Sequence, residues 1–243
     1  MTKSFVLFYG DARVPYQVQE DSKRSTRIAI HVDPDGTVVV DAPPGYSDQA
    51  VQQAVQKRAR WVVTHVAEAV HRFDQVRPRE YVSGEQVLYL GRRYVLKVIL
   101  TPKPCKMPKL LGNRLQVESR TGDLDDIRGR VRAWYRSRAR EYFAQRLNQI
   151  SARLSWVDMT PSFRLLEMSR QWGSCSPTGQ IILNPHLVKA PRQAVDYVLI
   201  HELAHLIHHN HGPEFFEVLD REMPEWTVHK LILDGMVEQL TNE

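Results

Sequence analysis

The sequence predicts an α+β protein with two regions. A β-rich N-terminal region with one amphipathic helix, residues 1–122, precedes a region built from a short sheet and helices, residues 123–243. Three observations support this prediction. Runs of β-branched residues separated by turn residues occur in the first region, an apolar period of three to four residues begins after residue 122, and an almost wholly apolar helix precedes residue 210.

Composition and charge narrow the class of protein. Hydrophobic residues make up 42% of the 243 residues and charged residues 25%, as in ordinary soluble domains. No stretch approaches the roughly 20 apolar residues of a membrane-spanning helix, and the apolar run of the opening segment is too short for a secretory leader. We therefore expect a cytoplasmic protein without a membrane partner. The net charge of +5 would suit nucleic acid, but many basic proteins bind none.

The N-terminal region contains signals for two hairpins and a helix. Residues 26–45, TRIAIHVDPDGTVVVDAPPG, predict a hairpin that turns at Asp33-Pro34-Asp35-Gly36. Ser47 is a suitable N-cap for one helix reaching about Val76. Alternation on both sides of Gly91 predicts a second hairpin over residues 84–100, and residues 113–119 predict a further strand. The proline-rich segment 101–113 predicts a surface loop.

A long helix is expected from about Asp123 to Leu154. Apolar residues recur on one face at helical spacing: Ile127, Val131, Trp134, Tyr135, Ala139, Phe143 and Leu147. Another face carries six arginines: Arg128, Arg130, Arg132, Arg136, Arg138 and Arg140. These arginines suit either a nucleic-acid surface or a solvated face balanced by nearby acids, which is the more common arrangement. Two strands follow, in residues 162–168 and 179–184.

The next helix begins at Pro191 and carries the chemistry, in the segment HELAHLIHHNH, residues 201–211. His201 and His205 are four residues apart, so both imidazoles lie on one helix face and can converge on one ion. The side chain of Glu202 projects about 100° around the helix from that of His201, so it can reach a metal-bound water without becoming a ligand. Because the helix is apolar almost all round, it is expected to be buried, and buried imidazoles need partners. A zinc ion would be such a partner.

A catalytic zinc takes three protein ligands and keeps one position open. The candidates for the third ligand are His208, His209, His211, Glu214 and Glu217. His208 would sit one turn further along the helix axis than the ion. Residues 210–213, Asn-His-Gly-Pro, can turn the chain back, so we favour His211, with Glu217 as the next choice.

Other residues receive structural interpretations or stay open. Trp172, Trp226 and the free thiol of Cys175 are interpreted as buried packing residues, and Asp196 as a helix-face or supporting group. The strand GQIILN, residues 179–184, is the expected edge strand for an extended substrate. Four side chains are weak candidates for an electrophile that stabilises the transition state: His186, Tyr197, His208 and His209.

The segment from Arg170 to Trp226 resembles the YgjP-like metallopeptidase family, which is related to SprT-like and minimal gluzincin proteases. The residues that match its pattern are Trp172, Gly173, Ser174, Cys175, Asn184, Pro191, His201, Glu202, His205, Asn210 and His211. Gln171 and Phe216 depart from it, standing where arginine and tryptophan are usual. The resemblance extends more loosely to nearly the whole chain. The same histidine spacing occurs in metzincins, but their required glycine is replaced here by His208.

This resemblance implies a zincin-like catalytic region with His201, His205 and His211 as zinc ligands and Glu202 as general base. The expected activity is zinc-dependent hydrolysis of peptide bonds in a peptide or protein substrate. The alternative is a zinc-stabilised, nucleic-acid-associated protein with little or no peptidase activity, since SprT-like proteins act on protein bound to DNA. The arginine face would link the two functions.

Overall fold

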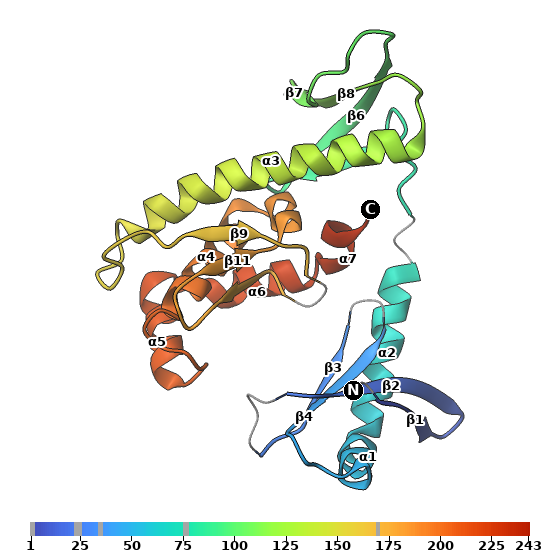
Figure 1. The fold of residues 1–243 in the computed structure, drawn as a ribbon, viewed down its shortest axis with the longest axis vertical. Helices are drawn as coiled ribbons and strands as arrows, with labels where there is room; N and C mark the ends of the chain where they lie inside the picture. The colour runs from blue at the N-terminus through green and yellow to red at the C-terminus, as the bar shows by residue number, and fades with distance from the viewer. Residues whose placement is uncertain (1–2, 22–25, 34–35, 75–77, 169–170) are drawn as a thin grey trace. The chain divides into compact units, whose positions relative to one another are not determined.

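The structure is a computed structural model that describes residues 3–21, 26–33, 36–74, 78–168 and 171–243. Its α+β composition confirms the predicted fold class (Figure 1). The chain divides into two compact units, Met1–Arg77 and Pro78–Glu243. None of the described helices is long and apolar enough to cross a membrane.

The first unit contains a four-stranded sheet in the order β1-β2-β4-β3. Its strands are β1 (Lys3–Tyr9), β2 (Ala12–Glu20), β3 (Ala29–Val32) and β4 (Val38–Ala42). β3 and β4 pair antiparallel, as the first hairpin signal predicts, whereas β2 and β4 pair parallel. Pro34 and Asp35 of the expected turn lie outside the described residues.

Two helices occupy the segment in which a single helix was expected. They are α1 (Asp48–Lys57) and α2 (Ala59–Asp74), and Ser47 caps α1 by accepting a hydrogen bond from the Ala50 amide at 3.2 Å. The helices are separated at Arg58, where the backbone leaves the helical region (φ −107°, ψ 11°) and the amide donates to the Val55 carbonyl. The apolar period continues across this break, because α1 and α2 bury the same face against the sheet core. The expected last residues, 75 and 76, lie outside the described part.

The second unit begins with another four-stranded sheet, in the order β5-β6-β8-β7. Its strands are β5 (Gln86–Tyr89), β6 (Arg92–Leu100), β7 (Lys109–Leu111) and β8 (Arg114–Ser119). The hairpin β5–β6 and the strand β8 confirm the predictions for these segments. The expectation of a loop throughout residues 101–113 was wrong at its end, since β7 pairs antiparallel with β8 across a turn at Gly112 (φ +60°).

Helix α3 (Leu124–Ser151) begins next to Asp123, as predicted, and contacts both the sheet β5–β8 and the sheet that follows (Figure 1). Buried residues of β5, β6 and β8 belong to the same hydrophobic core as those of α3. Residues 78–122 therefore pack with the helices that follow them. The boundary expected at residue 122 differs from the boundary between the compact units, which lies after residue 77. Packing between residues distant in the sequence, rather than composition, associates the sheet β5–β8 with the helices.

The remaining elements surround a short three-stranded sheet with the order β10-β11-β9. Its strands are β9 (Phe163–Leu165), β10 (Gly173–Cys175) and β11 (Ile181–Leu183). A 3₁₀ turn, η1 (Pro185–Lys189), leads into α4 (Arg192–Ala204). The chain continues through α5 (Pro213–Glu222), α6 (Trp226–Asp234) and α7 (Val237–Thr241).

The turn between β5 and β6 fits tightly against the start of α4. Gly91 has φ +75°, and its amide donates to the Lys189 carbonyl at 3.1 Å. A Cβ atom at this position would lie 2.8 Å from the Cα of Pro191, closer than real Cβ contacts. The contact joins the sheet β5–β8 to the segment that starts α4.

This contact predicts that Gly91→Ala destabilises the protein more than Gly112→Ala does. Both glycines have positive φ, but nothing lies within 4 Å of a Cβ at Gly112. The strained backbone should cost each variant about 1–2 kcal/mol, and the clash with Pro191 should cost Gly91→Ala about 1–3 kcal/mol more. Urea unfolding of both variants measures the difference. Equal losses of stability would show that the turn does not depend on its contact with Pro191.

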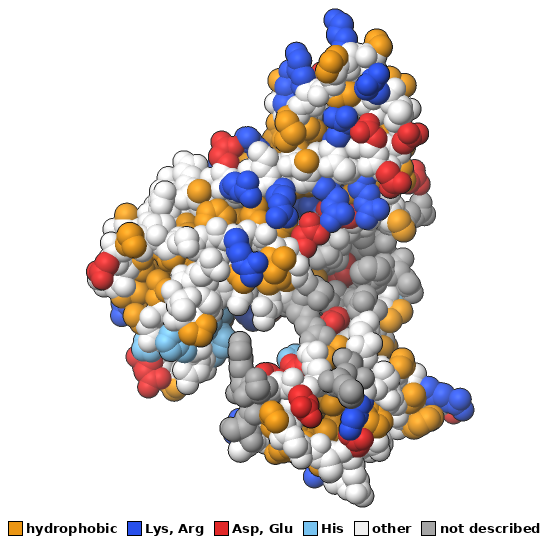
Figure 2. Space-filling model, viewed as in Figure 1, with side chains coloured by type: hydrophobic (Ala, Val, Ile, Leu, Met, Phe, Trp, Pro, Cys, Tyr) orange, Lys and Arg blue, Asp and Glu red, His pale blue; other side chains and the backbone are white. Residues whose placement is uncertain are grey.

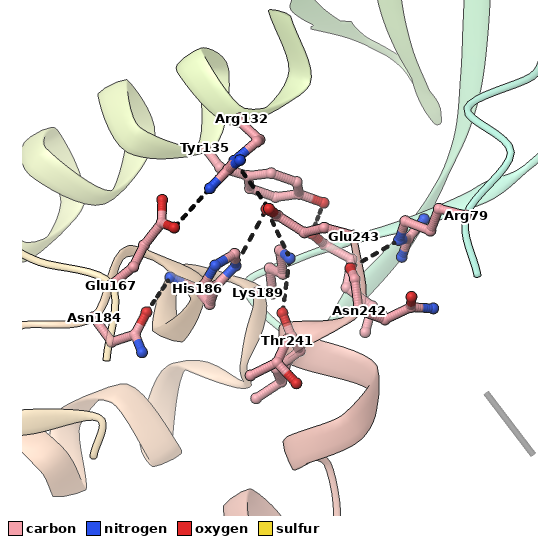
Figure 3. A network of polar contacts seen from close by, with 12 residues as sticks. Arg79, Arg132, Tyr135, Glu167, Asn184, His186, Lys189, Thr241, Asn242 and Glu243 are labelled. Carbon is pink, nitrogen blue, oxygen red and sulfur yellow. Dashed lines mark hydrogen bonds and ion pairs between the residues drawn. The ribbon is translucent and has the colours of Figure 1, made fainter. Parts of the chain in front are cut away.

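A buried polar network ties α7 and the residues after it to η1 and α3 (Figure 3). The Lys189 ammonium donates to the Leu240 carbonyl at 2.7 Å and lies 4.9 Å from the centroid of the Tyr135 ring. Glu243 lies 2.9 Å from Arg132 Nε and 3.5 Å from His186 Nδ1. His186, a candidate electrophile in the sequence, therefore takes part in this network.

Candidate metal centre

The helix that carries the HExxH segment is almost entirely buried, as the sequence predicts. Nine of its residues, Ala194, Val195, Tyr197, Val198, Leu199, Ile200, Glu202, Leu203 and Ala204, are buried. The helix ends earlier than expected, at Ala204 rather than near His209, and His205 is its C-cap. The Leu203 carbonyl near the helix end accepts hydrogen bonds from the Leu206 amide at 3.1 Å and from the indole Nε1 of Trp156 at 3.3 Å.

Beyond this end the chain turns back and brings a third histidine to the first two. Gly212 is the N-cap of α5 and Pro213 is its first residue, as predicted for the turn of residues 210–213. One ring nitrogen each of His201, His205 and His211 lies within 4.8 Å of the others. The Nε2 atoms of His201 and His211 are 3.0 Å apart.

This spacing fits a metal ion bound by three imidazoles. Zinc–nitrogen bonds of 2.0–2.1 Å at tetrahedral angles place ligand nitrogens about 3.4 Å apart. The Nδ1 of His205 lies 2.9 Å from the His208 carbonyl oxygen, to which it can donate a proton, so that Nε2 keeps its lone pair for a ligand. The Nδ1 of His201 is buried and has no hydrogen-bond partner among the described residues.

The protonation of these histidines also suits a metal. Burial, with the neighbouring His205 and His211, lowers the pKa of His201 to about 3. Burial and the nearby His205 also lower the pKa of His211. Both imidazoles are therefore neutral at neutral pH, which is the form that binds a metal.

One aromatic residue that the sequence analysis did not single out supports the centre. Phe215 is fully buried on α5, and its ring centroid lies 4.9, 4.7 and 4.6 Å from those of His201, His205 and His211. It therefore packs against all three imidazoles and limits the rotation of their rings. In the sequence its position three residues after Gly212 indicates only an apolar helix residue.

Glu202 lies on α4 with its side chain against β10. It is 5% exposed, and burial raises its pKa to about 8. A Cβ atom at Gly173 would lie 2.6 Å from Glu202 Oε1, so only glycine leaves room for this carboxyl group. A carboxyl group with a pKa near neutrality can both accept and return a proton.

The strand next to Glu202, β10, is one of the two edge strands of the three-stranded sheet. The expectation that residues 179–184 form an edge was wrong, because β11 pairs on both sides and the outer strands are β10 and β9. Cys175 lies on β10, and burial together with Glu202 raises the pKa of its thiol. The thiol stays protonated at neutral pH, which supports its interpretation as a packing residue.

The remaining candidates lie outside the histidine cluster. His209, Glu214 and Glu217 are exposed, and His208 contributes its backbone carbonyl. Tyr197 is 7% exposed, and its ring lies edge-on to His201 with 5.8 Å between centroids. Trp172 and Trp226 pack against the core.

Asp196 has a supporting role on α4. Its two carboxylate oxygens accept hydrogen bonds from Arg146 at 2.9 and 2.7 Å, which joins α4 to α3. This contact supports the interpretation of Asp196 as a helix-face or supporting group.

The arginines of α3 form a row over the helix, with acidic side chains close by (Figure 2). Three are paired with carboxylates: Arg130 with Asp126, Arg132 with Glu167 and Glu243, and Arg138 with Glu141. Arg136 donates to the Leu165 carbonyl. These pairs favour a solvated helix face balanced by acids over a surface that awaits nucleic acid.

Comparison with known proteins assigns the chain to a family. Comparison with curated proteins gives no match. Among solved structures, the metallopeptidase zymogen jannalysin of Methanocaldococcus jannaschii is 24% identical, with 38% of this chain and 95% of jannalysin covered and a TM-score of 0.32. The zymogen abylysin of Pyrococcus abyssi is 23% identical, with 42% and 96% covered and a TM-score of 0.33. The family model described as "YgjP-like, metallopeptidase domain" matches residues 26–236, so the chain belongs to the YgjP-like metallopeptidase family.

Proposed function

We propose that this protein is a zinc-dependent peptidase in which His201, His205 and His211 bind the ion and Glu202 is the general base. The observation that carries the proposal is the convergence of three imidazoles, with nitrogens within 4.8 Å of one another, in a chain of a metallopeptidase family. His201 lies on the buried helix α4, His205 is its C-cap, and His211 lies on the turn after it.

The donor set favours zinc over other divalent ions. Imidazole nitrogens suit zinc, whereas calcium and magnesium prefer oxygen ligands. Three protein ligands leave one coordination position for a small molecule, as in catalytic zinc sites. When bound, zinc acts as a Lewis acid that polarises a carbonyl group and makes a water molecule more acidic.

Glu202 supplies the proton transfers that amide hydrolysis requires. It accepts a proton from the attacking water and returns it to the leaving nitrogen, which would otherwise depart as an unstable anion. Burial raises the pKa of Glu202 to about 8, and the positive charge of a bound ion would favour the carboxylate form that accepts the proton. Gly173 allows the carboxyl group to lie close to the backbone of β10.

The substrate is a peptide or protein that binds in extended form along β10. Among the described residues no strand pairs with the outer side of β10, so its backbone groups can form hydrogen bonds with an added strand. Because β10 lies against Glu202, a peptide on this edge passes the proposed general base.

Incubation of the full chain with a library of unfolded peptides tests the function. Newly formed amino termini, identified by mass spectrometry, are expected when the chain carries zinc. A zinc-loaded chain that leaves the library intact would contradict the proposed peptidase activity. The same assay with single-stranded DNA tests the alternative, and cleavage only in its presence would favour a DNA-linked function.

A further inference from the structure

Three aromatic side chains form a stack beside the candidate metal centre: Tyr197 of α4, Trp226 of α6 and Phe216 of α5. The ring centroids of Tyr197 and Trp226 are 6.1 Å apart, with 15° between the ring planes. Those of Trp226 and Phe216 are 5.6 Å apart, with 21° between the planes. Three separate helices therefore contribute to one nearly parallel aromatic stack.

The stack is held rigidly by contacts on several sides. Tyr197 is 7% exposed. Trp226 is enclosed between the other two rings, and its indole Nε1 donates to Asp220 Oδ1 at 2.7 Å. Phe216 packs edge-to-face on the buried ring of Phe215, with 5.6 Å between centroids. A ligand that met this stack would therefore find a preformed surface.

Both ends of the stack lie close to the histidines. Tyr197 is 5.8 Å from His201, and Phe216 is 6.3 Å from His211, measured between ring centroids. The Phe216 end is open, since 37% of this residue is exposed. The open end of the stack thus lies about one side-chain length from the histidine cluster.

The position of Phe216 beside the histidine cluster determines which part of a substrate can contact it. A substrate whose scissile carbonyl lies at the histidine cluster has its neighbouring Cα atoms within about 4 Å of that carbonyl group. The side chain of a residue flanking the bond can therefore reach Phe216. Aromatic rings gain most from contact with other large apolar or aromatic groups, which lose hydrated surface and, when aromatic, pack offset-stacked or edge-to-face.

We propose that Phe216, supported by Trp226, forms the subsite for the side chain of one residue flanking the cleaved bond, and that it selects large apolar and aromatic side chains. This inference rests on the proposed peptidase function and specifies its substrate class. Phe216 and Trp226 act in specificity, and the chemical step is left to the histidine cluster and Glu202.

The test compares peptides that differ at one position. A peptide cleaved by the zinc-loaded full chain is resynthesised with Ala, Leu or Phe at each residue flanking the bond, and kcat/KM is measured for each peptide. At one of the two positions we expect Phe to exceed Ala by about tenfold or more, in the range known for apolar pockets. Phe216→Ala should reduce this Phe-to-Ala ratio to near one, whereas Phe216→Trp, which keeps a flat ring, should retain it.

Leu231→Ala is the matched control, because Leu231 is a 70% exposed apolar residue of α6 outside the stack. This variant should keep the wild-type Phe-to-Ala ratio of kcat/KM. Zinc content and thermal unfolding establish that each variant is folded, and Phe216→Leu is measured in place of Phe216→Ala if the latter does not fold.

The outcomes separate the two proposals. A wild-type ratio near one at both positions, or an undiminished ratio in Phe216→Ala, overturns the subsite while the peptidase function stands. If the zinc-loaded wild type cleaves no peptide at all, the peptidase function fails and the subsite with it.

Discussion

Replacing Glu202 by glutamine should lower kcat/KM for peptide cleavage by a factor of about 10²–10⁴, the range for loss of a general base. The amide has nearly the same shape as the carboxyl group and fits against Gly173, but it cannot accept a proton from water. The variant should bind zinc and remain folded, because burial already disfavours the charged form of this side chain. Steady-state kinetics on one peptide, with metal analysis of the same samples, measures both effects.

Glu217→Gln is the control for this substitution. Glu217 is an exposed carboxylate on α5, outside the histidine cluster, so its variant should cleave at the wild-type rate. Undiminished cleavage by zinc-loaded Glu202→Gln would exclude Glu202 as the base. A strong loss of activity in Glu217→Gln would instead indicate that Glu217, our second choice for the third ligand, takes part in the site.

Replacing His211 by alanine should weaken zinc binding by at least about a hundredfold. Loss of a residue that only supports a ligand already costs 10- to 100-fold in affinity, and His211 is proposed to bind the ion directly. The fold should survive, because His211 is exposed and α5 stays anchored by the buried ring of Phe215. Competition with a coloured zinc chelator gives the affinity.

Glu217→Ala is again the matched variant. If His211→Ala kept the wild-type affinity and Glu217→Ala lost it, the third ligand would be the acid on α5. The spacing of the imidazole nitrogens predicts the opposite result, since His211 lies with His201 and His205 and Glu217 does not.

The histidine cluster was the part of the molecule most accessible to sequence analysis, because its geometry is local. Four-residue spacing on a helix determines that His201 and His205 share a face. Residues 210–213, Asn-His-Gly-Pro, favour a turn that brings His211 back to that face. The structure contains this turn. The same local reasoning applies to the hairpin β5–β6 and to the start of α3, which both follow from short-range signals.

Features that depend on partners distant in the sequence were not predicted correctly. The edge position of β10 follows from the order of three strands, and Gly173-Ser174-Cys175 has no β-branched residue to mark a strand. At the early end of α4, Trp156 donates a hydrogen bond to the Leu203 carbonyl, and His205 Nδ1 contacts the His208 carbonyl. Residues 205–209 contain no glycine or proline that would indicate this early end.

Dependence on contacts distant in the sequence also explains the other differences between the predicted and the observed structure. The apolar period continues across the break at Arg58, so the sequence predicts one helix where two exist. The association of residues 78–122 with the helices depends on packing against α3 and on the contact of Gly91 with Pro191, which no local pattern encodes. Phe215 could be recognised as apolar, but its contact with three imidazoles depends on the turn of the chain after α4.

A zinc titration of the metal-free wild-type chain tests whether hydrolysis depends on one bound zinc ion. The chain is freed of metal with a chelator, returned to known zinc-to-protein ratios, and assayed for hydrolysis of a single peptide. The account predicts no hydrolysis without metal, a rise in proportion to added zinc, and a plateau at one zinc per chain. Full hydrolysis by the metal-free chain, or none by the chain loaded with one zinc, would contradict it.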